Sequence, residues 1–144
     1  MILQIHAYLA LIILAFIAYL LIGIFRKYQA KQAYQDTDLR KALFALILVY
    51  IQMLVGLAHY FMSPAYHHLK EIGFGAAMKD PQTRLLTVEH PLMMLLAILF
   101  ISLGFVKHRK KTQAMKKYKT LLIFYTIALL FMLSRIPWHQ WLFA

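Results

Sequence analysis

Cysteine is absent from this sequence of 144 residues. Without thiols the chain cannot form disulfide bridges, iron–sulfur clusters, thiolate metal sites or the covalent haem linkage of a C-x-x-C-H motif. Acidic residues are scarce, because five Asp and Glu stand against sixteen Lys and Arg, a formal net charge of +11. Long polar stretches are also missing, since 62% of the residues are hydrophobic, against roughly 45–50% in a soluble domain. This composition indicates an integral membrane protein with almost nothing left for a soluble domain.

Four apolar segments can be distinguished, at about 3–25, 42–62, 86–106 and 120–136. Each is close to the ~20 residues that a helix needs to cross the hydrocarbon core. The first is not expected to be a signal peptide, because no basic region precedes it and no small-residue cleavage site follows it. Short connections make neighbouring helices antiparallel. The predicted fold class is therefore all-α, with residues 1–144 forming one integral membrane four-helix up-down-up-down bundle.

The basic residues are distributed unevenly over the connections. Stretches 26–41 and 107–119 hold twelve Lys and Arg together, whereas 63–85 holds three. The positive-inside rule therefore places both termini and the 63–85 connection outside. The basic connections are expected to contact anionic lipid of the bilayer and not nucleic acid. The 63–85 connection is expected to form a short interfacial helix around 67–72 or a lid.

Histidines gather at the helix ends that this topology places outside. An ionisable ring at membrane depth is costly unless it binds or reacts with something. Facing imidazoles in a membrane bundle suit a b-type haem, whose macrocycle fills the space between helices. The inner half offers no such site, because His108 is assigned to a basic connection and expected to be solvated, so one haem per chain is predicted. The candidate ligands are His6, His59, His90 and His139.

Other polar residues at the same depth are assigned supporting roles. Arg84 and Arg135, with Lys79 as an alternative, are expected to bind the haem propionates. Tyr60 and Glu89 are expected to orient a ligand histidine, as such partners usually do. Alternatively, Glu89 pairs with Arg84 or transfers protons in quinol chemistry, because acidic residues at membrane depth often mark proton routes.

Each apolar segment also carries residues at helical spacing that predict an interior face. Four small residues are assigned to this interior, because small residues let membrane helices approach closely: Gly56, Ala97, Gly104 and Ala128. Met93 and Met94 are expected to be packing residues, with a histidine–methionine axial pair as the alternative.

Four stretches of the sequence resemble a family of small four-helix membrane proteins of Bacteroidota grouped as cytochrome b proteins. The similarity covers nearly the whole chain, and the stretch around EHP is its most specific part. The stretches are TVEHPLMM at 87–94, IQMLVGLAHYFMSP at 51–64, IFYTIALL at 123–130 and IPW at 136–138. A more distant resemblance is to HemJ-type protoporphyrinogen oxidases, which are also small four-helix proteins with a histidine in the first helix.

The resemblance implies a haem b protein of the bacterial cytoplasmic (inner) membrane, relaying electrons near its outer, periplasmic face. The family pattern has one histidine early in the first helix, which matches His6, and one in the EHP motif, which matches His90. These two are the preferred axial ligands. His59 falls where relatives are expected to have an apolar residue, which makes it an alternative ligand. The other alternative is His139, which lies beside two tryptophans.

Two other functions compete with the electron relay. One is an oxidoreductase acting on a quinol or a porphyrin, with quinone as a further cofactor. The other is a non-catalytic subunit of a larger membrane complex, in which the histidines bond to a partner protein. The relay predicts a redox or membrane-protein partner and a haem spectrum, whereas the subunit predicts a colourless protein.

Overall fold

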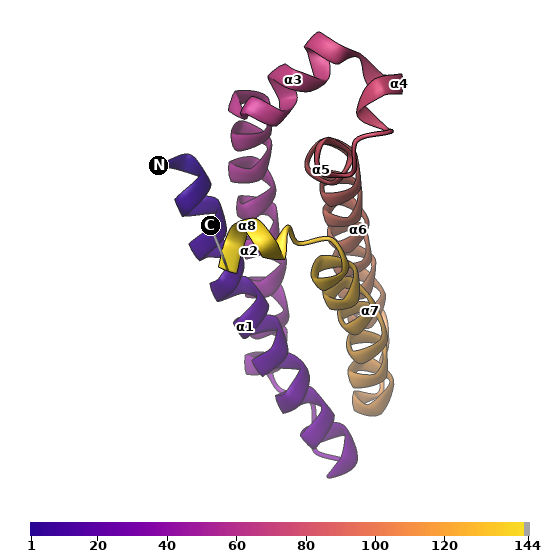
Figure 1. Cartoon of the computed structure of the whole chain (residues 1–144). Coiled ribbons are helices and arrows are strands. Elements are labelled where there is room, and N and C mark those ends of the chain that lie inside the picture. The colour runs from indigo at the N-terminus through magenta and orange to yellow at the C-terminus, as the bar shows by residue number, and fades with distance from the viewer. Residues whose placement is uncertain (143–144) are drawn as a thin grey trace.

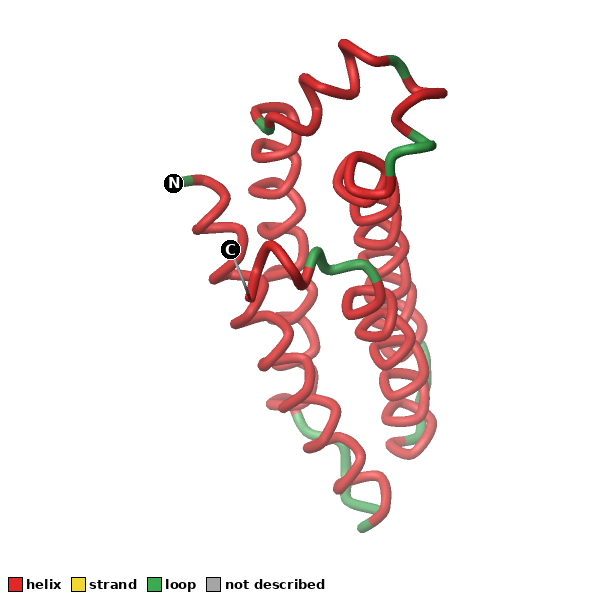
Figure 2. Tube along the Cα trace, in the orientation of Figure 1, coloured by secondary structure: helices red, strands yellow, loops and turns green. Residues whose placement is uncertain are grey.

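Four long helices form the body of the protein in a computed structural model that describes residues 1–142 (Figure 1). They are α1 (Ile2–Gln29), α2 (Asp36–Met62), α6 (His90–Arg109) and α7 (Ala114–Ser134). Each is long and apolar enough to cross a membrane, the third within a helical stretch that begins at Pro81. The described residues contain no strand, and loops make up little of the trace (Figure 2). The predicted all-α, multi-pass membrane architecture is therefore confirmed.

The helices extend further into the basic connections than predicted. α2 begins at Asp36 and not at residue 42, and α7 begins at Ala114 and not at residue 120. Lys and Arg favour helix nearly as well as Leu, so a helix does not end where its apolar run ends. At the start of α2, Gln35 and Asp38 form a capping box that satisfies backbone amides of the first turn.

The four helices pack in a ring in which each contacts two neighbours. α1 contacts α2 and α7, and α6 contacts the same two helices. Consecutive helices run in opposite directions, as predicted. Side chains at helical spacing fill the interior, and the buried ones are Ile13, Ile17, Leu20, Leu21 and Ile24 of α1, Ala42, Ala45 and Val49 of α2, Ala97, Ile101 and Phe105 of α6, and Tyr118, Leu121, Tyr125, Ala128 and Met132 of α7. The predicted interior position of Ala97 is thus confirmed.

The buried core lies towards one end of the bundle. We call this the basic end, because the connections 26–41 and 107–119 lie there, and we call the opposite end, where His6, His59 and His90 lie, the histidine end. α1 buries no side chain before Ile13, α2 buries none after Val49, and α6 buries none before Ala97. Figure 1 shows the α1–α2 hairpin and the α6–α7 hairpin diverging towards the histidine end. The apolar side chains of α1, α2 and α6 there remain partly accessible.

Short helices complete the histidine end. They are α3 (Pro64–Ile72), α4 (Phe74–Ala77), α5 (Pro81–Arg84), the π-helical turn η1 (Leu85–Glu89), which leads directly into α6, and α8 (Trp138–Leu142). Ser63 caps α3 by accepting a hydrogen bond from the amide of Tyr66 at 3.2 Å. Gly73 ends α3 with a φ of 81°, a conformation that favours glycine. The short helix predicted around 67–72 is therefore confirmed, with its start at Pro64.

Candidate functional site

Three of the four candidate histidines meet at the histidine end. The rings of His6 and His59 lie within 25° of parallel, with centroids 6.1 Å apart. The rings of His6 and His90 are nearly perpendicular, at 89°, with centroids 6.2 Å apart. His6 is thus the middle ring, between side chains of α2 and α6. His139, the fourth candidate, lies on α8, after the chain has left α7.

The ring of His6 lies against the backbone of α2. A Cβ built on Gly56 would lie only 2.9 Å from Cε1 of His6, so a glycine lets the imidazole approach this closely. The side-chain amide of Gln52 donates to the carbonyl oxygen of His6 at 2.8 Å. Nδ1 of His6 and Oε1 of Gln52 are buried without a hydrogen-bond partner among the described residues. Buried polar atoms are rarely left unsatisfied, which makes these two candidates for ligand contacts.

The ring of His90 is oriented by the backbone of another helix end. Its Nδ1 lies 2.9 Å from the carbonyl oxygen of Arg135. A carbonyl can only accept, so Nδ1 carries the proton and, in the neutral ring, Nε2 keeps its lone pair. Such a bond from the second ring nitrogen to a carbonyl is typical of histidines that ligate metals.

The backbone before His90 is irregular for a reason found in the sequence. Pro91 has no N–H, so it cannot donate to the carbonyl oxygen of Thr87, its partner in a regular helix. The hydroxyl of Tyr60 donates to that oxygen instead, at 3.1 Å. The five residues of η1 form a π-turn, a feature that often marks functional sites. Tyr60, predicted to orient a ligand histidine, thus orients the turn that carries His90.

Both arginines predicted to bind propionates lie beside Glu89. Nε of Arg84 lies 2.8 Å from Oε1 of Glu89, and Nε of Arg135 lies 3.3 Å from Oε2 of the same carboxylate. Arg84 also donates to the carbonyl oxygen of Met78 at 2.7 Å. The predicted alternative that Glu89 pairs with Arg84 is confirmed. Two cations and one anion leave this cluster with one net positive charge at the rim of the site.

His108 was expected to be solvated, and this prediction is wrong. α6 continues to Arg109, and the His108 side chain is 0% exposed inside it. Its Nε2 lies 2.8 Å from the hydroxyl of Tyr34, and its Nδ1 lies 2.5 Å from the carbonyl oxygen of Phe105. The spacing of Ala97, Ile101 and His108 on one helix face is the sequence signal that could have found it.

Around His108 the basic end contains a polar network that sequence reasoning missed. Nζ of Lys27 lies 2.8 Å from Oδ1 of Asp38, a carboxylate that is only 3% exposed. The hydroxyl of Tyr118 lies 3.3 Å from Oδ2 of Asp38 and donates to the carbonyl oxygen of Ala33 at 2.9 Å. Burial raises the pKa of Tyr34 to about 12, and the nearby Asp38 carboxylate adds to the rise. These contacts join the connection between α1 and α2 to the end of α6 and to the first turns of α7.

Compared with known proteins, the chain matches no family model, no curated protein and no solved structure. The likeness to cytochrome b proteins therefore stays a prediction. The geometry offers three imidazoles, with the His6 ring next to those of His59 and His90; the tautomer of His90 is fixed, and one nitrogen of His6 is unsatisfied. Among the described residues, no group of three or more His, Asp or Glu is arranged to hold a metal ion.

Proposed function

We propose that this protein binds one haem b at the histidine end through His6 and His90 and relays electrons there. The observation that carries the proposal is the 6.2 Å between the two ring centroids. Both rings would be near enough to hold one metal ion between them, since a metal–nitrogen bond is about 2.0 Å long. The macrocycle would supply the other iron ligands, so His6 and His90 would be enough from the protein.

The residues around these rings fit such a group. The carbonyl of Arg135 holds His90 with Nε2 available, and His6 has a buried Nδ1 without a partner. His59 has a ring separation from His6 similar to that of His90. His90 is preferred because its second nitrogen is fixed by the backbone, which raises ligand basicity and prevents ring rotation.

The cluster of Arg84, Glu89 and Arg135 supports binding of the haem carboxylates. Its net charge is positive, and the side chains of both arginines are more than a third exposed, so their remaining N–H groups can reach a propionate. Lys79, in the turn between α4 and α5, is a further cation for this role.

Haem in such a site supplies one-electron transfer between the ferrous and ferric states. His108 is not a candidate for a second haem, because both its nitrogens already have partners. One haem cannot carry electrons across a hydrocarbon core of ~30 Å. The relay would therefore act along one face, between redox or membrane-protein partners. With the basic end in the cytoplasm, that face is the outer side of a bacterial cytoplasmic membrane.

The test is a dithionite-reduced minus oxidised spectrum with a pyridine haemochrome assay on detergent-purified protein. We expect a sharp α-band and about one haem b per chain. His6→Ala and His90→Ala should lose the haem, whereas His59→Ala should retain it. His68→Ala, on the exposed face of α3, is the matched control. Full haem content in His90→Ala would refute the ligand assignment, and a colourless wild-type protein supplied with haem would refute the function.

A quinol site is the second candidate, and one observation favours it. Nδ1 of His6 and Oε1 of Gln52 are both buried without a partner on adjoining helices, and both accept when the proton of His6 is on Nε2. The two hydroxyls of a quinol could donate to acceptors of this kind. Quinone extracted in stoichiometric amount from colourless protein, and lost in Gln52→Leu, would favour this function over the electron relay.

A further inference from the structure

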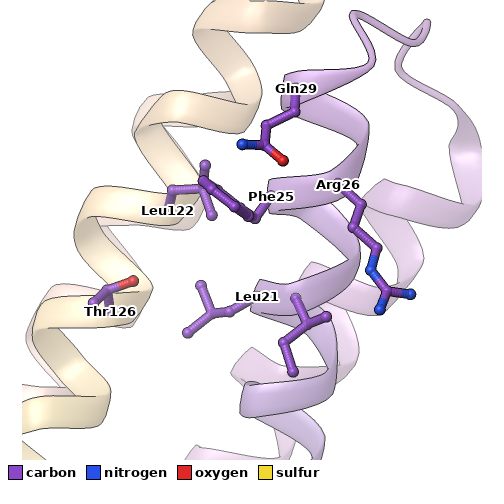
Figure 3. Close-up of a pocket in the computed structure, with 7 residues that line it drawn as sticks. Leu21, Phe25, Arg26, Gln29, Leu122 and Thr126 are labelled. Carbon is purple, nitrogen blue, oxygen red and sulfur yellow. The ribbon is translucent and has the colours of Figure 1, made fainter.

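A cavity of about 420 Å³ opens between α1 and α7 near the basic end (Figure 3). This volume lies within the ~300–1,000 Å³ of small-molecule sites. Its walls are mainly apolar, with Leu21 and Phe25 from α1 and Leu122 from α7. Figure 3 shows Phe25 and Gln29 pointing from α1 towards α7. The cavity therefore lies between two helices that span the membrane, and it is distinct from the histidine site.

The cavity has an apolar part and a polar part at different depths. Phe25 is 50% exposed although it lies on a helix that crosses the membrane, so its ring faces acyl chains. Arg26 and Gln29 line the cavity in the last turn of α1, where the apolar run ends. An occupant that fits has an apolar chain along Phe25 and a polar group at the level of Gln29.

The charge at the polar part is positive and uncompensated. The side chain of Arg26 makes no hydrogen bond or ion pair within the part of the chain that the structure describes. Its neighbour Lys27, by contrast, is paired with the Asp38 carboxylate. Lys119 is exposed and precedes Leu122 by three residues and Thr126 by seven, so it shares the helix face that lines the cavity. Arg26 thus lies at the α1 edge of the cavity, where Figure 3 shows its side chain directed away from α7, and Lys119 lies on the α7 face that lines it.

We propose that this groove is a binding site for an anionic phospholipid of the leaflet next to the basic end. Arg26 and Lys119 bind the phosphate, with the Gln29 amide as a further donor, and one acyl chain lies against Phe25 and Leu122. A neutral lipid would satisfy the apolar wall equally well but would leave the two cations uncompensated. Each basic side chain near the surface should favour an anionic headgroup by about fivefold.

The test uses a tryptophan reporter in the groove. The variant Phe25→Trp, in a Trp138→Phe, Trp141→Phe background, is placed in phosphatidylcholine vesicles containing phosphatidylglycerol. Brominated acyl chains on one lipid or the other quench the tryptophan on contact, which gives relative association constants for the two lipids. We expect phosphatidylglycerol to be preferred at least about fivefold at this position.

Two further variants separate a specific site from general attraction to the basic end. Arg26→Gln with Lys119→Gln should lower the preference below about twofold, whereas Lys110→Gln with Lys111→Gln removes the same charge and should leave it unchanged. A reporter placed by Leu103→Trp, on the exposed face of α6, should show less than half the preference. Equal preference at both reporter positions would overturn the proposal, as would equal losses in the two charge variants. Because Leu103→Trp keeps both cations, this comparison holds even if the charge variants fold poorly.

Discussion

The hydroxyl of Tyr34 lies 2.8 Å from Nε2 of His108, a residue 74 positions later in the chain. This contact joins the α1–α2 connection to the last turn of α6. Nearby, Tyr118 of α7 bonds to the same connection through Ala33. The basic end is therefore held by hydrogen bonds from the α1–α2 connection to α6 and α7, whereas the histidine end combines ring contacts, hydrogen bonds and ion pairs.

His108→Ala should destabilise the protein markedly. The change leaves the Tyr34 hydroxyl and the Phe105 carbonyl without a partner in a buried region, which typically costs roughly 1–3 kcal/mol. Unfolding in mixed micelles, followed by far-UV circular dichroism, measures the difference. His68→Ala removes an exposed histidine from α3 and should change the free energy of unfolding by less than about 0.5 kcal/mol. Equal stabilities of the two variants would show that the buried contact contributes nothing.

Tyr34 should make stability depend on pH in the alkaline range. Burial raises its pKa from 10.0 to about 12, so the folded state favours the neutral phenol. Its contribution is complete below pH 10, the unfolded pKa, and is lost as the pH rises through 12. A titration followed by tyrosinate absorbance should show one fewer group with a pKa near 12 in Tyr34→Phe than in the wild type. Between pH 10 and 12 this variant should also lose less stability than the wild type. If the tyrosine lost in Tyr34→Phe titrates near 10, the assignment is contradicted.

The spans and the gathering of histidines follow from simple physical rules. Length and apolarity decide which segments cross a bilayer, and alternating direction brings His6, His59 and His90 to one end. Rotation of each helix about its axis does not follow so directly, because packing decides it. The contact of His6 with Gly56 depends on that rotation, and so does the choice of neighbours for each ring.

Contacts between irregular segments were the least predictable part. Arg135 follows the last residue of α7, and its carbonyl reaches His90 only because the chain leaves the helix there. His108 was misjudged for a related reason. Its place among basic residues indicated a loop, but Lys and Arg continue a helix, and the face of Ala97 and Ile101 then buries it.

Two glycines should respond to alanine in opposite directions. In Gly104→Ala the new methyl group would overlap Cβ of Phe124 on α7, an atom fixed to the backbone, so α6 and α7 must separate. Overpacking of this kind costs typically about 1–3 kcal/mol. In Gly23→Ala nothing lies within 4 Å of the new atom, and the variant should gain roughly 0.5–1 kcal/mol from reduced backbone entropy. Thermal unfolding of both variants in the same detergent measures this difference. A shift of the unfolding temperature in the same direction and of similar size in both variants would contradict the prediction.

Gly56→Ala should impair haem binding without unfolding the bundle. Its new Cβ would lie 2.9 Å from Cε1 of His6, so the imidazole must move away from α2. The His6 imidazole is a side chain that can move without a shift of the backbone. The helices should therefore stay packed, and the far-UV circular dichroism spectrum should match that of the wild type. The ring would leave its place opposite His90, and the pyridine haemochrome assay should find less than half the wild-type haem. Gly23→Ala is the matched control, with full haem content expected. Equal haem in both variants would mean that the position of the His6 ring does not matter for binding, and His59 would then be the ligand to test next.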